Sequence, residues 1–387
     1  MTRTLVHLTT TDMSLDWLLR PQLEAFQDAG YDVIAMSAPG PHVDALEASG
    51  LRHYPIRSLT RSMSPRRDLA AMTELYRAFK VLDPTIVHTH NPKPGVFGRL
   101  AARAAGVPVI VNTVHGLYAL PDDRLHKRAV VYGLERIAAA CSDAELLQNT
   151  EDLAVLRRLG IPHDRLTVLG NGVDLDHFDP NRVPPSARSR LRAEFELDPD
   201  TVVIGVVGRL VWEKGYREIF DAAEELRDEN CVFVVVGPDD PDKPESVPAL
   251  AMAAARQHGV RFLGARDDMA DLYSMFDVYA LASYREGFPR SAMEAAAMGL
   301  PVVATDVRGC RQVVADGETG ALVPAGDAGR LASALRRLVA DPELRLRQGV
   351  AARVRAIEHF DHRDVIATTL RTYDVALGAS PALVTAS

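Results

Sequence analysis

Cysteine is scarce in this chain of 387 residues. It has three cysteines, Cys141, Cys231 and Cys310, and no two of them are close in sequence. This spacing gives neither a CxxC pair for zinc nor the dense cysteine pattern of a disulfide-stabilised secreted domain. We therefore expect three reduced thiols in a cytoplasmic protein.

Long hydrophobic runs are also missing. No window approaches the roughly 20 uninterrupted apolar residues that a membrane-spanning helix needs. The first residues, MTRTLVHLTTTDMSLDW, lack the basic stretch, apolar run and small-residue cleavage site of a secretory signal. These absences favour a cytoplasmic location without a spanning helix.

Basic residues are not in excess, because the net charge is -8. This balance argues against general nucleic-acid binding. Residues 1–175 hold 19 basic and 19 acidic residues, so the negative charge comes from the rest of the chain, with 44-19=25 basic and 52-19=33 acidic residues. Within the neutral half, residues 52–69 carry five arginines and one acid. This segment is either a solvated surface or a patch for an anionic acceptor or lipid head groups, with peripheral contact between the N-terminal domain and the cytoplasmic face of a membrane.

The chain is longer than the roughly 250–300 residues at which a single core stops growing, so we expect two domains. Short segments that are apolar throughout alternate with amphipathic ones, as is typical of parallel strands covered on both faces. The expected strands lie in residues 4–10, 32–38, 85–90, 107–116, 144–150, 166–172, 202–210, 231–237, 260–265, 278–283, 301–307 and 320–326. A Pro- and Arg-rich stretch, residues 178–200, interrupts the series and is expected to join the domains.

The pattern predicts an α/β protein with two doubly wound domains in series. We expect an N-terminal domain over residues 1–178 and a C-terminal domain over 179–361. The remaining residues, 362–387, are expected to form a helix that returns to the N-terminal domain, followed by a frayed tail. Because such sheets bind ligands beyond the carboxyl ends of their strands, motifs at strand ends matter most.

The stretch REGFPRSAMEAAAMG, residues 285–299, carries two carboxylates, Glu286 and Glu294. Gly287 favours irregular backbone and Pro289 favours a first helical turn, so we expect Glu286 in a loop and Glu294 inside the next helix. Loop carboxylate, helix N-terminus and helix carboxylate together could hold a phosphorylated, polyhydroxylated ligand. The alternative is a capped surface helix with two solvated acids.

A second motif is GVVGRLVWEKG, residues 205–215, in which Gly208 follows a strand and Arg209 and Lys214 follow the glycine. Two such cations can neutralise a diphosphate, or can simply be surface charges on a loop. The stretch contains neither GxGxxG nor GxxxxGK[ST], so it is neither the dinucleotide fingerprint nor a P-loop.

The N-terminal half has polar residues at strand ends. His115 ends a strand just before a glycine, although a lone histidine is more often structural. His90 and Lys93 suggest a cradle for an acceptor phosphate, with a strand-end histidine and a solvated lysine as the alternative. In the first loop, residues 17–19 (WLL) could line an acceptor groove or form a buried helix face.

In combination, these motifs resemble the retaining nucleotide-sugar glycosyltransferases of family 4. The resemblance lies in GRLVWEKG (208–215), in NGVDLDHFDP (171–180) and in the stretch from residue 260 to residue 327 with its E-x7-E pattern. Residues 87–116 resemble the branch that builds capsular, O-antigen and similar surface glycans. The resemblance implies the GT-B fold, with two facing Rossmann-like domains and a cleft between them.

The resemblance also implies roles for single residues. Arg209 and Lys214 would hold the donor diphosphate, Glu286 the hydroxyls of the donor sugar, and Glu294 the ribose. His115 would act at the reacting sugar, so the implied catalytic residues are His115, Glu286, Arg209 and Lys214. The implied donor-binding residues are Gly208, Arg209, Lys214, Gly264, Glu286, Gly287, Phe288, Pro289 and Glu294, and the implied acceptor-binding residues are His90 and Lys93.

The implied activity is transfer of a hexosyl or N-acetylhexosaminyl group from a nucleoside diphosphate, with UDP favoured, to a hydroxyl of a sugar or lipid-linked acceptor. Retention would follow from same-face attack assisted by the leaving phosphate, with no cofactor and no metal. The first loop departs from the pattern because it lacks glycines, which leaves the acceptor open. Two other functions stay open: a sugar-nucleotide epimerase on the same fold and a non-catalytic nucleotide-sugar-binding partner.

Overall fold

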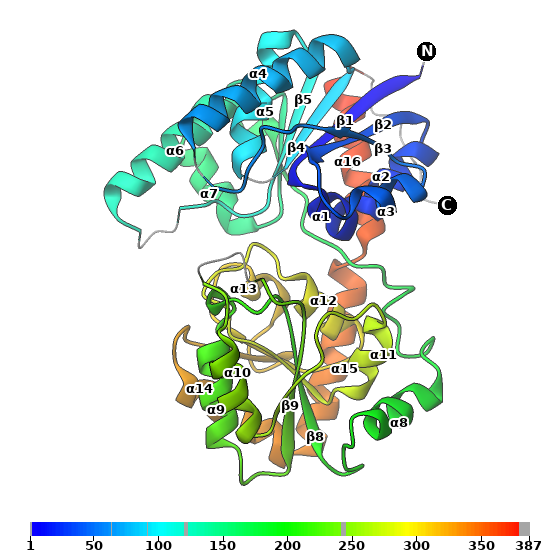
Figure 1. The fold of residues 1–387 in the computed structure, drawn as a ribbon, viewed down its shortest axis with the longest axis vertical. Coiled ribbons are helices and arrows are strands. Elements are labelled where there is room, and N and C mark those ends of the chain that lie inside the picture. Colours follow the sequence, from blue (N-terminus) through cyan, green and yellow to red (C-terminus); the bar gives the residue numbers. More distant parts are fainter. Residues whose placement is uncertain (1, 63, 91, 120–122, 241–244, 379–387) are drawn as a thin grey trace. The chain divides into compact units, whose positions relative to one another are not determined.

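The computed structural model describes residues 2–62, 64–90, 92–119, 123–240 and 245–378. The chain divides into two compact units (Figure 1). Unit 1 comprises residues 1–170 and 363–387, and unit 2 comprises residues 171–362. Each unit contains one parallel sheet with helices on both of its faces, so the predicted α/β class is confirmed.

The sheet of unit 1 has seven strands in the order β3-β2-β1-β4-β5-β6-β7. The strands are β1 (Arg3–Thr11), β2 (Tyr31–Ala38), β3 (Arg52–Pro55), β4 (Ile86–His90), β5 (Val109–Val114), β6 (Ala144–Leu147) and β7 (Leu166–Val168). All six strands predicted in this half form. Strand β3 was not predicted, because this short edge strand has no buried residue and therefore no apolar run.

The helices of unit 1 cover both faces of this sheet. They are α1 (Asp12–Ser14), the π-helical η1 (Leu15–Leu19), α2 (Arg20–Asp28), α3 (Val43–Ala48), α4 (Pro65–Leu82), α5 (Pro92–Ala105), α6 (Leu125–Ala139), α7 (Thr150–Arg158), the short η2 (His163–Arg165) and α16 (His362–Ala376). Helices α4, α5 and α6 pack in sequence, each against the next (Figure 1). In η1, Leu19 is buried whereas Trp17 and Leu18 are exposed, so the predicted buried face holds only for Leu19.

The sheet of unit 2 has six strands in the order β10-β9-β8-β11-β12-β13, and all six were predicted. They are β8 (Val202–Val207), β9 (Cys231–Val236), β10 (Val260–Phe262), β11 (Val278–Leu281), β12 (Val302–Thr305) and β13 (Gly320–Val323). Alternate residues of β8 enter two different core clusters, Val202 and Ile204 in one and Val203 in the other. Burial on both faces explains why the strand is apolar throughout.

The helices of unit 2 are α8 (Pro185–Glu194), the 3-10 helix η3 (Trp212–Lys214), α9 (Tyr216–Glu225), α10 (Ala249–Gln257), α11 (Met269–Met275), α12 (Arg290–Ala297), α13 (Cys310–Val313), α14 (Ala328–Ala340) and α15 (Pro342–His359). Two of them begin at capping aspartates. Asp327 accepts from the backbone N–H of Arg330, and Asp341 accepts from that of Leu344, each at 2.9 Å. These caps satisfy amides that the first turn of a helix leaves without a partner.

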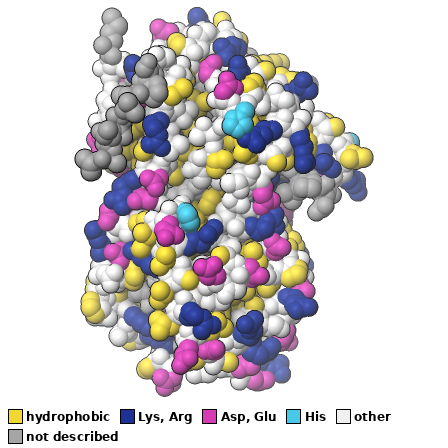
Figure 2. All heavy atoms as spheres, turned by 180° about the vertical axis from the view of Figure 1, so that it is seen from behind, with side chains coloured by type: hydrophobic (Ala, Val, Ile, Leu, Met, Phe, Trp, Pro, Cys, Tyr) yellow, Lys and Arg dark blue, Asp and Glu magenta, His cyan; other side chains and the backbone are white. Residues whose placement is uncertain are grey.

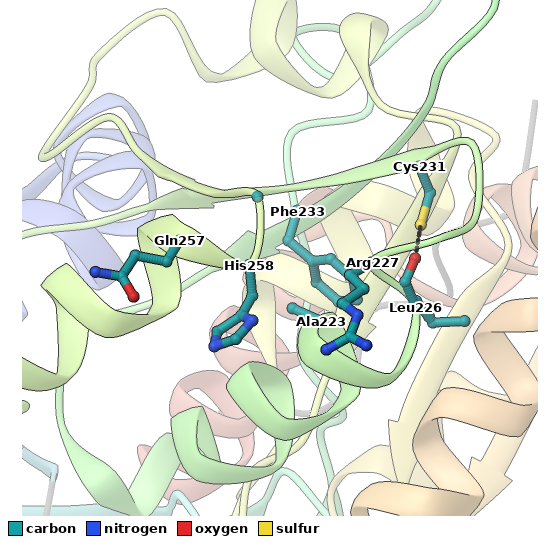
Figure 3. A pocket seen from close by; sticks show the side chains of 8 residues that line it. Ala223, Leu226, Arg227, Cys231, Phe233, Gln257 and His258 are labelled. Atoms are coloured by element: carbon teal, nitrogen blue, oxygen red, sulfur yellow. Dashed lines mark hydrogen bonds between the residues drawn. The ribbon is translucent and has the colours of Figure 1, made fainter.

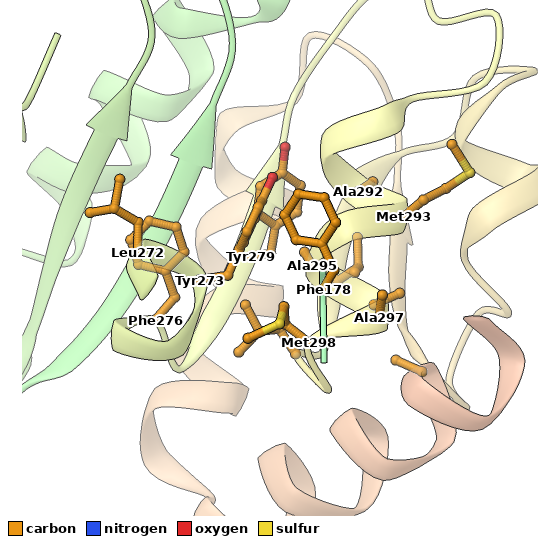
Figure 4. Packing of buried hydrophobic residues seen from close by; sticks show 14 of the residues in the cluster. Phe178, Leu272, Tyr273, Phe276, Tyr279, Ala292, Met293, Ala295, Ala297 and Met298 are labelled. Atoms are coloured by element: carbon orange, nitrogen blue, oxygen red, sulfur yellow. The ribbon is translucent and has the colours of Figure 1, made fainter. Parts of the chain in front are cut away.

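The division between the units comes after residue 170, eight residues before the predicted boundary at 178. The intervening residues pack in unit 2. The N–H of Val173 donates to the carbonyl of Phe360, and the ring of Phe178 meets that of Tyr273 edge to face at 5.8 Å. Figure 4 shows Phe178 within this core, beside α12. The segment between β7 and residue 178 is short and has few apolar residues. Its sequence therefore did not indicate which of the two units it packs with.

The stretch 178–200 does not join the two units, as the sequence suggested, because it lies within unit 2. It contains α8, where Leu191 is buried. The buried guanidinium of Arg192 donates to the carbonyls of Asp198 and Pro199, so a residue type expected in a solvated linker holds the chain in place.

Helix α16 packs with unit 1, where Tyr373 is fully buried beside strands β1 and β2. The predicted frayed tail falls mostly on residues 379–387, which lie outside the described residues. None of the helices among the described residues has the length and apolar character needed to cross a membrane. Cys141, Cys231 and Cys310 are free thiols.

Candidate functional site

The sheet of unit 2 reverses its strand order at one point, between β8 and β11. Strands β9 and β10 lie on one side of this pair, and β12 and β13 lie on the other. In open parallel sheets, the crevice beyond the strand ends at such a switch point is the usual ligand site. The segment after β8 carries Gly208 and Arg209 and, at the end of η3, Lys214, and the loop after β11 carries Glu286. Both donor motifs predicted from the sequence therefore lie at this switch point.

A glycine lets these two loops meet. Gly215 has a φ of 76°, and a Cβ atom at this position would lie 2.0 Å from the carbonyl oxygen of Ala282. Only glycine permits both the left-handed backbone and this close approach. As a result, Lys214 Nζ donates to Glu286 Oε1 at 2.7 Å, and Ser283 Oγ donates to the same oxygen at 2.7 Å.

The backbone of Glu286 is also held from the side of β12. A Cβ atom at Gly309, in the loop after β12, would lie 2.7 Å from the carbonyl carbon and oxygen of Glu286. The carboxylate of Glu286 thus has a fixed backbone and two hydrogen-bond donors. It is largely buried, whereas the Lys214 side chain is partly exposed.

On the other side of β8, three glycines meet at the ends of neighbouring strands. A Cβ atom on Gly237, after β9, would lie 2.0 Å from the carbonyl oxygen of Gly208. The N–H of Gly237 donates to the carbonyl of Gly264, after β10, at 2.8 Å. Beside them, Arg209 Nη1 lies 2.5 Å from Asp240 Oδ2. The arginine charge is therefore balanced by a carboxylate that the sequence motif did not include.

Glu294 lies on α12 and is buried. The hydroxyl of Tyr273 donates to its Oε2 and Arg290 Nε donates to its Oε1, both at 2.9 Å. Burial raises the pKa of Glu294, while Arg290 and Tyr273 act in the opposite direction. Since Glu286 and Glu294 both have little exposure, the alternative of two solvated acids on a surface helix is wrong.

Phe288 and Pro289 lie between the two acids, Glu286 and Glu294, and their surroundings differ from each other. Pro289 is the residue before the first turn of α12, as the N-cap rather than the expected first helical residue. The ring of Phe288 packs against Phe360 at 5.8 Å, and its carbonyl accepts from Asn171 Nδ2 at 3.3 Å. Phe288 thus packs against the core of unit 2 while staying partly exposed.

Histidines dominate the corresponding switch point of unit 1, between β1 and β4. His7 lies on β1, His88 and His90 lie on β4, and His115 follows β5. His90 Nδ1 is 3.0 Å from His115 Nε2, and His90 Nε2 is 2.9 Å from His7 Nδ1. His7, His88 and His90 are buried and His115 is half-buried.

The histidine contacts continue to the last helix of the chain. The hydroxyl oxygen of Tyr373, on α16, is 3.1 Å from His7 Nε2 and 2.5 Å from His88 Nδ1. His88 Nε2 in turn lies 2.7 Å from Thr113 Oγ1. We call these six residues the histidine relay: Thr113, His88, Tyr373, His7, His90 and His115.

Burial keeps the histidines of the relay neutral. It lowers the pKa of His7 to about 3 and that of His115 to about 4, the latter despite a side-chain hydrogen bond to Gln148. The pKa values of His88 and His90 are also well below the ordinary value, first because of burial and then because of the neighbouring histidines. At neutral pH each ring therefore has one N–H and one bare nitrogen.

His7, His88 and His90 also form a group whose metal-ligating atoms lie within 4.8 Å of one another. Each of their six ring nitrogens, however, is within hydrogen-bond distance of a neighbouring side chain. These contacts account for the cluster without a metal ion.

The two residues predicted to bind the acceptor are both engaged within unit 1. Lys93 is buried, not solvated as the alternative interpretation had it: its Nζ lies 2.5 Å from Asp68 Oδ1 and donates to the carbonyl of Ser62 at 2.6 Å. His90 bonds to His7 and His115. Acceptor binding by His90 and Lys93 stays a prediction, and it requires these contacts to be shared or broken.

The arginines of residues 52–69 are all exposed. Arg57 and Arg66 line a groove of about 700 Å³ along α4, together with Tyr54, Leu69 and Arg77. The exposed arginines fit the interpretation of residues 52–69 as a solvated surface. The basic groove beside them fits the other interpretation, a patch for an anionic acceptor or lipid head groups. Figure 2 shows basic, acidic and hydrophobic side chains interspersed over the visible face of the units.

A small pocket in unit 2 lies away from the donor motifs. It has a volume of about 140 Å³ and lies between the last turns of α9 and α10, where Arg227 and His258 flank Phe233 (Figure 3). Cys231, which also lines it, begins β9. Because the strands are parallel, this pocket lies at the sheet edge opposite to Lys214 and Glu286, away from the predicted donor site.

Comparisons with known proteins agree with this geometry. The family model "Glycosyltransferase Family 4" matches residues 22–177, and the model "Glycosyl transferases group 1" matches residues 187–355. A D-inositol 3-phosphate glycosyltransferase from Xylanimonas cellulosilytica is 36% identical over 312 residues, which cover 77% of this chain and 73% of the relative. The chain belongs to glycosyltransferase family 4.

Two further similarities describe this glycosyltransferase. An Escherichia coli UDP-Gal:alpha-D-GlcNAc-diphosphoundecaprenol alpha-1,3-galactosyltransferase is 29% identical over 335 residues, with 84% of each chain covered. The crystal structure of Anabaena Alr3699/HepE in complex with UDP and glucose has a TM-score of 0.80 at 19% identity, covering 96% of this chain and 100% of that one. The likeness confirms the GT-B fold.

Sequence reasoning predicted the donor motifs of the glycosyltransferase but missed residues that contact them. Asp240 and Tyr273 each contact a predicted site residue from a distant part of the sequence, and Ser283 contacts Glu286 from three residues earlier in the same loop. Arg290 is the exception, since its spacing of four residues from Glu294 on a helix is a readable signal for an ion pair.

Acidification should destabilise the glycosyltransferase through His7. In the unfolded chain His7 takes up a proton near pH 6.5, but in the folded protein it stays neutral down to about pH 3. Stability is therefore lost as the pH falls below 6.5, by about 2 kcal/mol at pH 5 from this residue. Urea unfolding at pH 7 and pH 5 measures the loss.

The variant His7→Gln should lose less stability between these two pH values than the parent. The exposed His359 provides the control, and His359→Gln should retain the parent's pH dependence. If His7→Gln loses as much stability as the parent, His7 does not have a lowered pKa.

Proposed function

We propose that this glycosyltransferase transfers a hexosyl or N-acetylhexosaminyl group from UDP to a hydroxyl acceptor, with retention of configuration and without a metal ion. The observation that carries the proposal is the pair of Lys214 and Glu286 at the β8–β11 switch point. It joins a cation suited to phosphate with a carboxylate suited to sugar hydroxyls, at the place where parallel sheets bind nucleotides.

The present partners of the two cations support a route by which a donor would bind. Lys214 is paired with Glu286 and Arg209 is paired with Asp240. A diphosphate offers both cations a more highly charged partner than a single carboxylate. When Lys214 turns to the diphosphate, Glu286 loses one of its two donors and can accept hydrogen bonds from hydroxyls of the donor sugar instead.

The same residues can assist departure of UDP. Negative charge grows on the diphosphate as the glycosidic bond breaks, and Arg209 and Lys214 are fixed cations that stabilise this charge. Glu294 is proposed to accept from the ribose hydroxyls, with Tyr273 and Arg290 holding its carboxylate in position. His115, neutral at pH 7, is proposed to contact the reacting sugar by hydrogen bonds and not by charge.

The relatives favour UDP and a lipid-linked acceptor. The Anabaena structure contains UDP and glucose, and the E. coli relative is named for a galactosyl donor on UDP and an acceptor on diphosphoundecaprenol. We propose the same classes here, in assembly of a surface glycan. The basic groove with Arg57, Arg66 and Arg77 suits the anionic diphosphate of such an acceptor.

A lipid-linked acceptor requires contact with a membrane, and we propose α6 of unit 1 for it. Val130 and Ile137 on this helix are 61% and 58% exposed, and Leu125 and Leu134 are exposed as well. The lone acid of the helix, Glu135, is paired with the buried Arg99. The remaining charged residues of α6 are basic, so the helix is amphipathic and cationic, as interfacial helices are.

The proposed reaction is tested with purified protein, UDP-hexoses and a short-chain polyprenyl-diphosphate sugar. We expect release of UDP only when donor and acceptor are both present, an α-linked product from an α-linked donor by NMR, and full turnover in EDTA. Loss of turnover in EDTA with recovery in Mg²⁺ or Mn²⁺ would disprove the metal-free reaction. Conversion of the donor alone to an epimeric UDP-sugar would instead indicate an epimerase.

Glu286 and Glu294 are expected to contribute at different stages of the reaction. Glu286→Gln removes the charge that orders the sugar in the transition state, so turnover should fall, with UDP affinity nearly intact. Glu294→Gln weakens a contact that is the same before and during reaction, so the donor KM should rise. Steady-state kinetics and UDP binding by calorimetry measure both. Identical profiles for the two variants, or full turnover in Glu286→Gln, would show that these roles are misassigned.

Membrane contact through α6 is tested by sedimentation with vesicles. The parent should bind vesicles with 30–40% anionic lipid (a rough composition at which basic helices adsorb) and should bind zwitterionic vesicles weakly. Val130→Glu with Ile137→Glu should abolish binding. The matched control is Val350→Glu with Val354→Glu on α15 of unit 2, at side chains of 58% and 49% exposure. Equal binding by the α6 variant and the parent would exclude α6.

A further inference from the structure

The histidine relay is a continuous chain of hydrogen bonds with five links. It begins at Thr113, passes through His88, Tyr373, His7 and His90, and ends at His115. Both nitrogens of His7, His88 and His90 take part, and the Tyr373 hydroxyl is shared by two rings. Nδ1 is the nitrogen of His115 that His90 does not contact, and the His115 side chain also has a hydrogen bond with Gln148.

Proton counting restricts the relay to two arrangements. A neutral imidazole donates from one nitrogen and accepts at the other, so a ring bonded at both nitrogens passes on the direction of donation. The Tyr373 hydroxyl has one proton, and His7 and His88 are the partners that the described residues offer it. If it accepted from both rings, its own buried proton would lack a partner, which is costly.

The two arrangements differ in a way that can be measured. When donation runs toward His115, the proton is on Nδ1 in all four histidines. When donation runs away from His115, the proton is on Nε2 in all four. In the first case His115 has an N–H at Nδ1, and in the second it has a bare acceptor there.

We propose that Tyr373 and His7 fix the tautomer of His115 through this relay, and so decide whether His115 meets its ligand as a donor or as an acceptor. Tyr373 and His7 are positioning residues, because they act on His115 through other side chains. The catalytic consequence rests on the proposed function, in which His115 contacts the reacting sugar. The tautomers themselves can be observed without any substrate.

Tyr373 is the residue to change, because one oxygen atom carries two of the five links. Tyr373→Phe keeps the ring, which stacks edge to face with Phe26 and His88, and removes only the hydroxyl. Tyr31→Phe is the matched control. Its ring lies 6.0 Å from that of Tyr373 in the same core cluster, but its hydroxyl bonds to Arg3 and not to a histidine.

The first measurement is the tautomer of each histidine by two-bond ¹H–¹⁵N NMR. In the parent protein we expect His7, His88, His90 and His115 to share one tautomer. In Tyr373→Phe, His115 should populate both tautomers, and Tyr31→Phe should give the parent spectrum. Differing tautomers among the four histidines of the parent would overturn the relay, and so would an unchanged His115 in Tyr373→Phe.

The second measurement is the kinetic effect, with thermal unfolding to verify that the variants are folded. Tyr373→Phe should lower turnover roughly 10-fold or more with an unchanged donor KM, as expected when a catalytic histidine loses its tautomer. In a His115→Ala background the same change should have no further effect. An equal effect in both backgrounds would show that Tyr373 acts on stability alone and would overturn its positioning role.

The two measurements separate failure of this inference from failure of the proposed function. Full turnover in His115→Ala would overturn the proposed role of His115, and with it the catalytic consequence of the relay. The spectra decide on the relay itself in either case.

Discussion

The close approach of backbone segments at the β8–β11 switch point is the constraint on which the proposed donor site depends. Gly215 and Gly309 bring two loops against the chain around Glu286, at distances that a Cβ atom would prevent. This approach gives Lys214 and Ser283 access to one carboxylate oxygen. Because these backbone segments already lie close together, the charged side chains meet without extending far.

The same topological rule produces chemically different results in the two units. Each sheet reverses its strand order once, and each reversal gathers polar side chains. In unit 2 these are ions, each balanced by an opposite charge that a ligand can replace. In unit 1 they are neutral rings, because burial without a carboxylate beside them disfavours the imidazolium form. An ionic site favours exchange of partners, whereas a neutral chain favours fixed geometry.

Sequence predicted the parts of this protein that depend on local patterns. Every predicted strand formed, because strands covered on both faces must be apolar throughout, and the spacing of Lys214 and Glu286 from their strands followed from the same series. The sequence did not indicate which residues distant from one another in the chain form contacts in the fold. The sequence left Lys93 open between an acceptor contact and a solvated lysine, because Asp68 is 25 residues away, and nothing near His7 points to a tyrosine 366 residues later. Edge strand β3 and the boundary at 170 lacked an apolar signal of their own.

The return of α16 to unit 1 has a consequence for the order in which the protein is made. The ribosome completes strands β1 to β7 first, then the whole of unit 2, and only then α16. Until α16 is made, His7 and His88 lack their contacts with the hydroxyl of Tyr373. Helix α16 therefore completes unit 1 only after unit 2 has been synthesised, and the contacts of Tyr373 with His7 and His88 form at that stage.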